Sequence, residues 1–80
     1  MVLPLSAEAR VDVTIVNIAG RVVRRLATDR SLPAGVTRMA WNGGSDAGTT
    51  VPAGRYLVRV RAAAQGGRAS TALTGLQVRR

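Results

Sequence analysis

Few side chains in this 80-residue sequence could perform acid–base or nucleophilic chemistry, because it contains neither His nor Cys. The usual general base and the usual strong nucleophile are therefore both missing. The acidic residues are Glu8, Asp12, Asp29 and Asp46. A glycosidase-like pair needs two carboxylates facing one cleft, about 5 to 9.5 Å apart, and the scatter of these four along the chain gives no reason to expect one. We therefore predict that the chain is not an enzyme.

One segment has the composition of a metal-binding loop, the Gly-rich stretch that contains Asn42, Ser45 and Asp46. Oxygen ligands at close spacing can wrap Ca²⁺, but a calcium site usually needs more than one carboxylate. We instead expect Asn42 and Asp46 to hydrogen-bond the backbone of their own loop, as these residues commonly do in turns. The sequence thus predicts no metal, no cofactor and no calcium dependence.

Arginine is the feature that most suggests a ligand, since all 12 basic residues are Arg, against 4 acidic residues, for a net charge of +8. Such an excess is typical of polyanion binding, although a GC-rich genome also produces Arg-only, Ala-rich chains. The candidate partner-binding residues are Arg55, Arg59 and Arg61 on one strand face, and Arg24 and Arg25 on the first hairpin. The alternative is a solvated face that keeps sheet edges from aggregating.

These arginines have no exposed aromatic side chains between them on which bases could stack, which disfavours specific nucleic-acid recognition. An acidic polymer and a protein partner both remain open. If Arg59 and Arg61 share a strand face, they stand about 7 Å apart and repel each other. We expect an acid on an adjacent strand to relieve that repulsion, with Asp12 as the candidate.

The elements that position these residues are read from hydrophobic alternation and turn residues. Val11, Val13 and Ile15 alternate with polar residues, as in a half-buried strand. The segment 17–20 has Asn first and Gly fourth, which is typical of a type I turn. The expected strands cover 1–5, 10–17, 22–29, 36–41, 55–63 and 68–78, the last as an edge strand, with loops or turns at 31–35, 42–48, 51–54 and 65–67.

Six or seven short strands with a turn about every 8 to 12 residues indicate a β-sandwich or small barrel. The length indicates one domain over 1–80, which we expect to be a fragment or subunit of a larger assembly. Trp41 and Tyr56 are the only aromatic residues. We expect both to be buried in the core, with Thr37, Met39 and Trp41 on the inward face of one strand.

In the order of its turns, the sequence resembles members of the FlgD immunoglobulin-like domain family. The most specific part is the run Trp41-Asn42-Gly43, Asp46-Ala47-Gly48 and Pro52-Ala53-Gly54-Arg55-Tyr56. The fold-defining residues implied by this resemblance are Trp41, Asn42, Gly43, Gly48, Gly54 and Tyr56. The family occurs in the flagellar hook-capping protein and as a C-terminal module of secreted bacterial proteins, and it is similar to the C-terminal sorting domains of type 9 secretion.

The resemblance implies an all-β, immunoglobulin-like antiparallel β-sandwich and a non-catalytic structural or attachment module of a bacterial extracellular or cell-surface assembly. The partner would be a protein or the parent polypeptide. The alternatives are a C-terminal secretion or sorting domain and a basic polyanion-binding module. No stretch approaches the ~20 apolar residues of a membrane span, and a secretion signal is expected upstream of Met1.

Overall fold

The computed structural model describes residues 2–64 and 66–79, so Gln65 of the expected turn at 65–67 lies outside the described residues, as do both chain ends. The described residues form six strands, within the expected six to seven. They are β1 (Val2–Leu5), β2 (Ala9–Asn17), β3 (Val22–Leu32), β4 (Gly35–Arg38), β5 (Gly54–Ala64) and β6 (Ala69–Val78). No helix that could span a membrane occurs in the described ranges.

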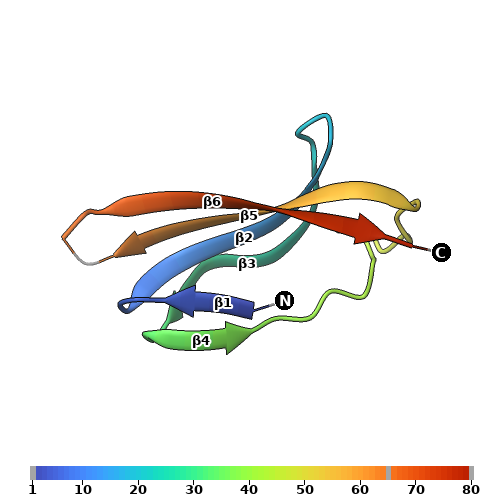
Figure 1. Ribbon diagram of the computed structural model, residues 1–80. Helices are drawn as coiled ribbons and strands as arrows, with labels where there is room; N and C mark the ends of the chain where they lie inside the picture. The colour runs from blue at the N-terminus through green and yellow to red at the C-terminus, as the bar shows by residue number, and fades with distance from the viewer. Residues whose placement is uncertain (1, 65, 80) are drawn as a thin grey trace.

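The strands form two antiparallel sheets, which confirms the predicted immunoglobulin-like sandwich. The larger sheet has the order β3-β2-β5-β6, and β1 pairs with β4 in a two-stranded sheet. Figure 1 shows this short pair lying against part of the larger sheet, while the chain between β4 and β5 crosses to the end where the C-terminus lies. The sandwich is therefore lopsided, with two strands opposing four.

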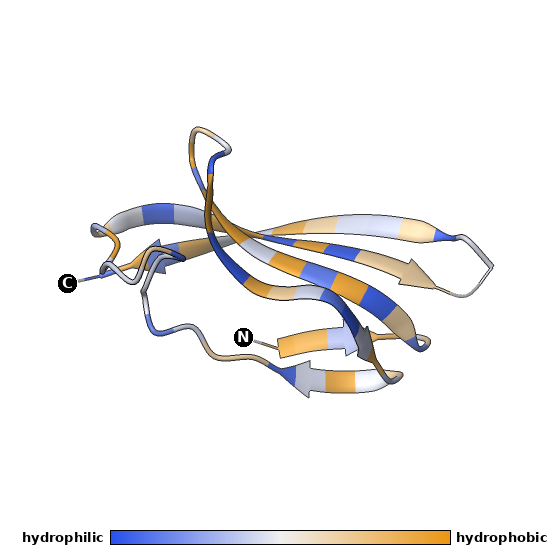
Figure 2. Ribbon diagram, turned by 180° about the vertical axis from the view of Figure 1, so that it is seen from behind, coloured by the Kyte–Doolittle hydropathy of each residue, from blue (hydrophilic) through white to orange (hydrophobic). Residues whose placement is uncertain are grey.

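The core is built on β2, whose alternation the sequence had indicated. Val11, Val13 and Ile15 are at most 1% exposed, and Val13 and Ile15 lie opposite Val60 and Val58 of β5. Figure 2 shows the resulting hydrophobic and hydrophilic bands along the central strands. The opposite face of β2 is also partly covered, because Thr14 and Val16 are buried there. Side chains on both faces of β2 are therefore buried, but the sandwich core lies on the face of Val11, Val13 and Ile15.

The edge strand β3 is irregular where it pairs with β2. Its register shifts at three places, and Asp29 has φ +48°, in the left-handed region that non-glycine residues seldom adopt. The Asp12 carboxylate accepts a 2.7 Å hydrogen bond from the Asp29 amide at this point. Bulges of this kind twist an edge strand and make it a poor template for further pairing.

The prediction of a strand over 36–41 was wrong in extent, since β4 ends at Arg38. The side-chain alternation was correct, because Thr37, Met39 and Trp41 are all half-buried. Full burial of Trp41 was also wrong, whereas Tyr56 is buried at 7% exposure. The physical reason is that β4 pairs with β1 from Gly35 to Arg38, while residues 39–41 belong to no ladder in the described part of the chain.

Candidate partner-binding surfaces

The fold-defining residues of the sequence analysis come together in one loop corner, formed by 41–56. The rings of Trp41 and Tyr56 meet edge to face, with centroids 5.9 Å apart. The indole N–H of Trp41 donates to the Gly44 carbonyl at 2.8 Å, and the Tyr56 hydroxyl donates to the Pro52 carbonyl at 2.7 Å. Both rings therefore close the loop through their polar ends while their apolar parts pack on the core.

Glycine is required in this loop corner by the backbone itself. Gly43, Gly48 and Gly54 have φ values of +81°, +84° and +148°, where an L side chain is strained. The Asn42 side-chain oxygen accepts a 2.9 Å hydrogen bond from the Gly44 amide, as expected for a loop-stabilising Asn. The Trp-Asn-Gly run thus has a structural explanation in each of its three residues.

Asp46 departs from the expectation that it would bond its own loop. Its carboxylate instead accepts from the Arg25 backbone amide at 3.1 Å and from the Arg25 guanidinium at 3.2 Å. Its own amide donates to the Val23 carbonyl at 3.0 Å. Asp46 therefore fastens the loop corner to β3, because the short Asp-Ala-Gly turn points the carboxylate out of the loop.

The oxygens considered for a metal have protein partners in this arrangement. The Ser45 hydroxyl lies 2.8 Å from that of Thr49, and the Asp46 carboxylate faces arginine. In the described part of the chain, His, Cys, Asp and Glu form no group of three or more that could hold a metal ion.

Three of the candidate arginines share the outer face of the larger sheet. Arg59 and Arg61 of β5 are exposed and lie opposite Thr14 and Asp12 of β2. Together with Arg25 of β3 they line a shallow hollow of ≈ 470 Å³. We call Arg25, Arg59 and Arg61 the basic face.

Asp12 has the position predicted for it, directly opposite Arg61. Its Oδ1 atom is already engaged by the Asp29 amide, while Asp29 pairs with Arg10 at 3.1 Å. Asp12 thus places negative charge beside the basic face while it also holds the bulge of β3.

The other two candidate arginines lie elsewhere, so the five do not form one surface. Arg24 is half-buried on the side of β3 that faces the loop corner, where its Nη1 donates to the Ser45 carbonyl at 3.3 Å. Its Nε is buried, 3.9 Å from Asp46 Oδ1. Ordinary alternation explains this, because Arg25 lies opposite Thr14 and Arg24 opposite Ile15, and adjacent residues of a strand face opposite sides of the sheet.

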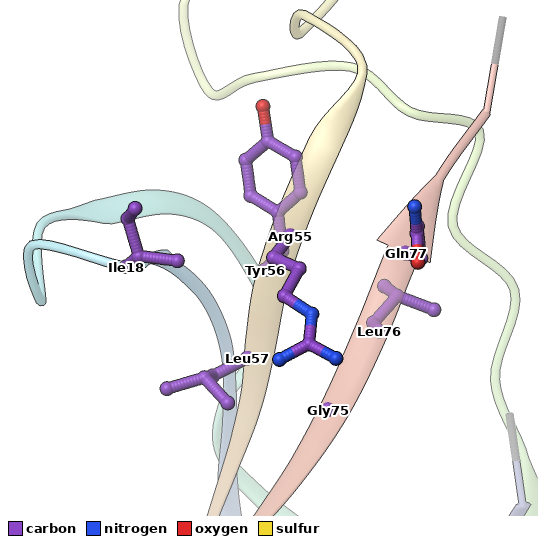
Figure 3. Close-up of a pocket in the computed structure, with 7 residues that line it drawn as sticks. All are labelled: Ile18, Arg55, Tyr56, Leu57, Gly75, Leu76 and Gln77. Carbon is purple, nitrogen blue, oxygen red and sulfur yellow. The ribbon is translucent and has the colours of Figure 1, made fainter.

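Arg55 lines a separate hollow with Ile18, Leu57 and Gln77, as Figure 3 shows. Ile18 is 80% exposed at the tip of the β2–β3 hairpin, which projects from the sheet in Figure 1. Along β5, Leu57 separates Arg55 from Arg59. Leu57 belongs to the same alternating set as Arg55, Arg59 and Arg61, so this apolar interruption of the arginine face follows from the sequence.

Comparison with known proteins identifies the family and a solved structure with a similar fold. The model of a family described as the FlgD Ig-like domain matches residues 2–66. No curated protein matches the chain in sequence. Among solved structures, the chain is similar to FlgD from P. aeruginosa, with a TM-score of 0.76 and 25% sequence identity. The similarity covers 95% of this chain and 57% of that one, so this chain spans little more than half of the relative.

Proposed function

Because the chain belongs to the FlgD Ig-like domain family, we propose that it is a non-catalytic structural or attachment module of a bacterial extracellular or cell-surface assembly. The observation that carries the proposal is the family match over residues 2–66, joined to the fold shared with FlgD. The family is structural, and FlgD relates to flagellar hook assembly. We propose further that 1–80 is one domain that works as part of a larger protein or assembly.

The use of the acidic side chains supports a non-catalytic role. Asp46 holds the loop corner on β3, Asp29 pairs with Arg10, and Asp12 supports the bulge. Each of the three carboxylates stabilises a junction between segments. Carboxylates committed in this way support the sandwich rather than acid–base chemistry.

The proposed partner is a protein or the parent polypeptide, and the basic face is the proposed contact. Arg59 and Arg61 are exposed, and the nearest acid, Asp12, is shared with the backbone of β3. The excess positive charge favours acidic partners through interactions that salt screens. An acidic polymer is the second candidate, which the same exposed charges favour.

Deleting the segment 2–79 in the producing bacterium tests the proposed function. We expect the polypeptide that carries the domain to be exported but lost from its assembly, so that an immunoblot finds it in the medium. Retention inside the cell would instead indicate the sorting role, and an unchanged distribution would contradict both. The double substitution Arg59→Gln/Arg61→Gln leaves the core unchanged and removes charge from the basic face only, so it should release the polypeptide in the same way if this face is the contact.

A further inference from the structure

The outer strand β6 is an unprotected sheet edge. Among the described strands its one neighbour is β5, and residues 69–75 are exposed on both faces. The segment Ala69–Val78 contains no charged residue and no proline, and it pairs with β5 in continuous register. Bulges, charges and proline are the usual means by which proteins block edge pairing.

The opposite edge shows the contrast within the same sheet. Three register shifts interrupt the pairing of β3, and this strand contains Arg24, Arg25, Asp29 and Arg30. Both edges are long, with 11 residues in β3 and 10 in β6. Only one of them is therefore blocked against addition of another strand.

The register shows which backbone amides of β6 point away from β5, toward the free edge of the sheet. The Ala64 amide donates to the Arg68 carbonyl at 2.7 Å, so this is a hydrogen-bonded pair. Because such pairs alternate along an antiparallel ladder, the residues that bond β5 are Ser70, Ala72, Thr74, Leu76 and Val78. The amides that point away from the sheet are those of Thr71, Leu73, Gly75 and Gln77.

The inner side of this edge opens on an apolar groove. A groove of ≈ 440 Å³ lies between β1 and the inner face of β5 and β6, and its lining includes Val2, Pro4, Val60, Ala72 and Thr74. Val2 is 58% exposed. The opposing sheet contains only β1 and β4 among the described strands. Apolar side chains on the inward side of an added strand would fill the space.

The outer side of the same edge is basic. No acidic residue occurs on β5 or β6, and Arg59 and Arg61 stand exposed on β5. A strand added next to β6 would lie two strand spacings, about 10 Å, from β5. An extended arginine side chain on β5 and a glutamate side chain on the added strand can together bridge this distance. Arg68 and Arg79, both exposed, flank the two ends of β6.

We propose that the free edge of β6 binds an extended polypeptide segment of another protein by β-strand addition. This segment has apolar residues on the side facing the groove and carboxylates on the side facing Arg59 and Arg61. The inference deepens the proposed attachment role and rests on it, since it names the docking surface and the chemistry of the partner.

A second copy of this chain does not fit the same surface. Its own β6 would bring Arg68 and Arg79 against those of the first copy, and each copy has a net charge of +8. Of the few acids, Asp12, Asp29 and Asp46 are already bound to backbone or arginine. Charge complementarity therefore favours an acidic partner strand.

The test uses a labelled peptide of the same 10-residue length as β6, with Val and Glu alternating and both ends capped. A peptide of equal composition with Val and Glu in separate blocks is the control. We expect the alternating peptide to bind more tightly in fluorescence anisotropy, by about tenfold, and to slow amide exchange at Thr71 and Leu73. Equal binding of the two peptides would overturn the proposal.

The substitution Leu73→Pro removes an outward amide without taking a bond from β5, a position where edge strands tolerate proline. We expect it to weaken peptide binding by about tenfold or more. The matched substitution Leu73→Thr keeps the amide and changes the side chain, so it should leave binding within about twofold. Thermal melts of both variants check that the fold is retained.

Two outcomes separate this inference from the proposed function. If the alternating peptide binds but Leu73→Pro binds it equally well, the docking surface is not β6, while the attachment role stands. If sedimentation shows a concentration-dependent dimer that Leu73→Pro abolishes, the edge belongs to a second copy and the proposal is wrong. Should Leu73→Pro unfold, Thr74→Lys replaces it, because a charge at this exposed position on the groove disfavours an apolar strand.

Discussion

Replacing Trp41 by Ala removes the side chain that joins the loop corner to the core. The indole ring packs against the core, meets Tyr56 edge to face at 5.9 Å, and donates to the Gly44 carbonyl at 2.8 Å. Its position outside the strands makes it a direct probe of the loop corner. The stability lost on substitution therefore measures how much this loop contributes to the fold.

The magnitude follows from the three contacts. Half-burial of a Trp removes about 100 Å² from water, worth about 2.5 kcal/mol at 25 cal/mol per Å². The ring pair contributes about 1 kcal/mol, and the indole hydrogen bond contributes about 1 kcal/mol. Because water reaches the half-buried Gly44 carbonyl when the indole leaves, we expect a loss of about 3 to 4 kcal/mol. A domain of this size has a stability of about 4 to 12 kcal/mol, so the substitution removes from about a quarter to all of it.

Urea unfolding followed by far-UV circular dichroism measures the loss, since the variant has no Trp to report by fluorescence. Trp41→Phe is the matched control: it keeps a ring against Tyr56 and loses the N–H donor, so it should cost about 1 kcal/mol. A loss below about 1 kcal/mol for Trp41→Ala, at unchanged urea slope, would refute the reasoning, because the loop corner would then contribute little to the fold.

Three further predictions concern the loop corner and its connection to β3. Asp46→Ala should lower the free energy of unfolding by about 1 to 2 kcal/mol in chemical denaturation. Asp46→Asn still accepts the hydrogen bond from the Arg25 amide, and exposed ion pairs contribute little, so it should cost under about 1 kcal/mol. Equal losses for the two variants would contradict this. Gly48→Ala should lower stability by about 1 kcal/mol through its left-handed backbone, while Gly75→Ala, where an added Cβ meets no atom within 4 Å, should be neutral in the same assay. A chelator should leave the melting temperature unchanged, because the loop oxygens bond protein groups, and a drop of several degrees would reveal a bound cation.

The parts of the fold that local chemistry determines were predictable from the sequence. The alternation of Val11, Val13 and Ile15 with polar residues identified β2 and its buried face, which the structure confirms. The turn at 17–20 is also confirmed, with Gly20 at φ +84° and its amide donating to the Asn17 carbonyl at 2.9 Å. Each of these features depends on neighbours within about four residues, which is the range over which sequence patterns are informative.

The parts that depend on distant segments were not predictable. The extent of β4 follows its pairing with β1, 30 or more residues earlier in the chain, so alternation through Trp41 extended the strand too far. The bond from Asp46 to Arg25 joins residues 21 positions apart, and no local pattern indicates it. The separation of Arg24 from Arg25, by contrast, was predictable, because adjacent residues of a strand face opposite sides of the sheet.

The asymmetry between the two edges of the larger sheet bears on how the module is used. A domain that only had to remain monomeric would gain from blocking both edges, since an unblocked edge invites aggregation. Here the charges and bulges lie on β3, while β6 is uncharged and regular. The open edge also adjoins the apolar groove beside β1 and the acid-free strand that presents Arg59 and Arg61. An uncharged strand, an apolar groove and a pair of exposed arginines are separate features of the molecule. Their meeting at one edge is explained by a single added strand, apolar on one side and acidic on the other, which completes the sheet and the sandwich together.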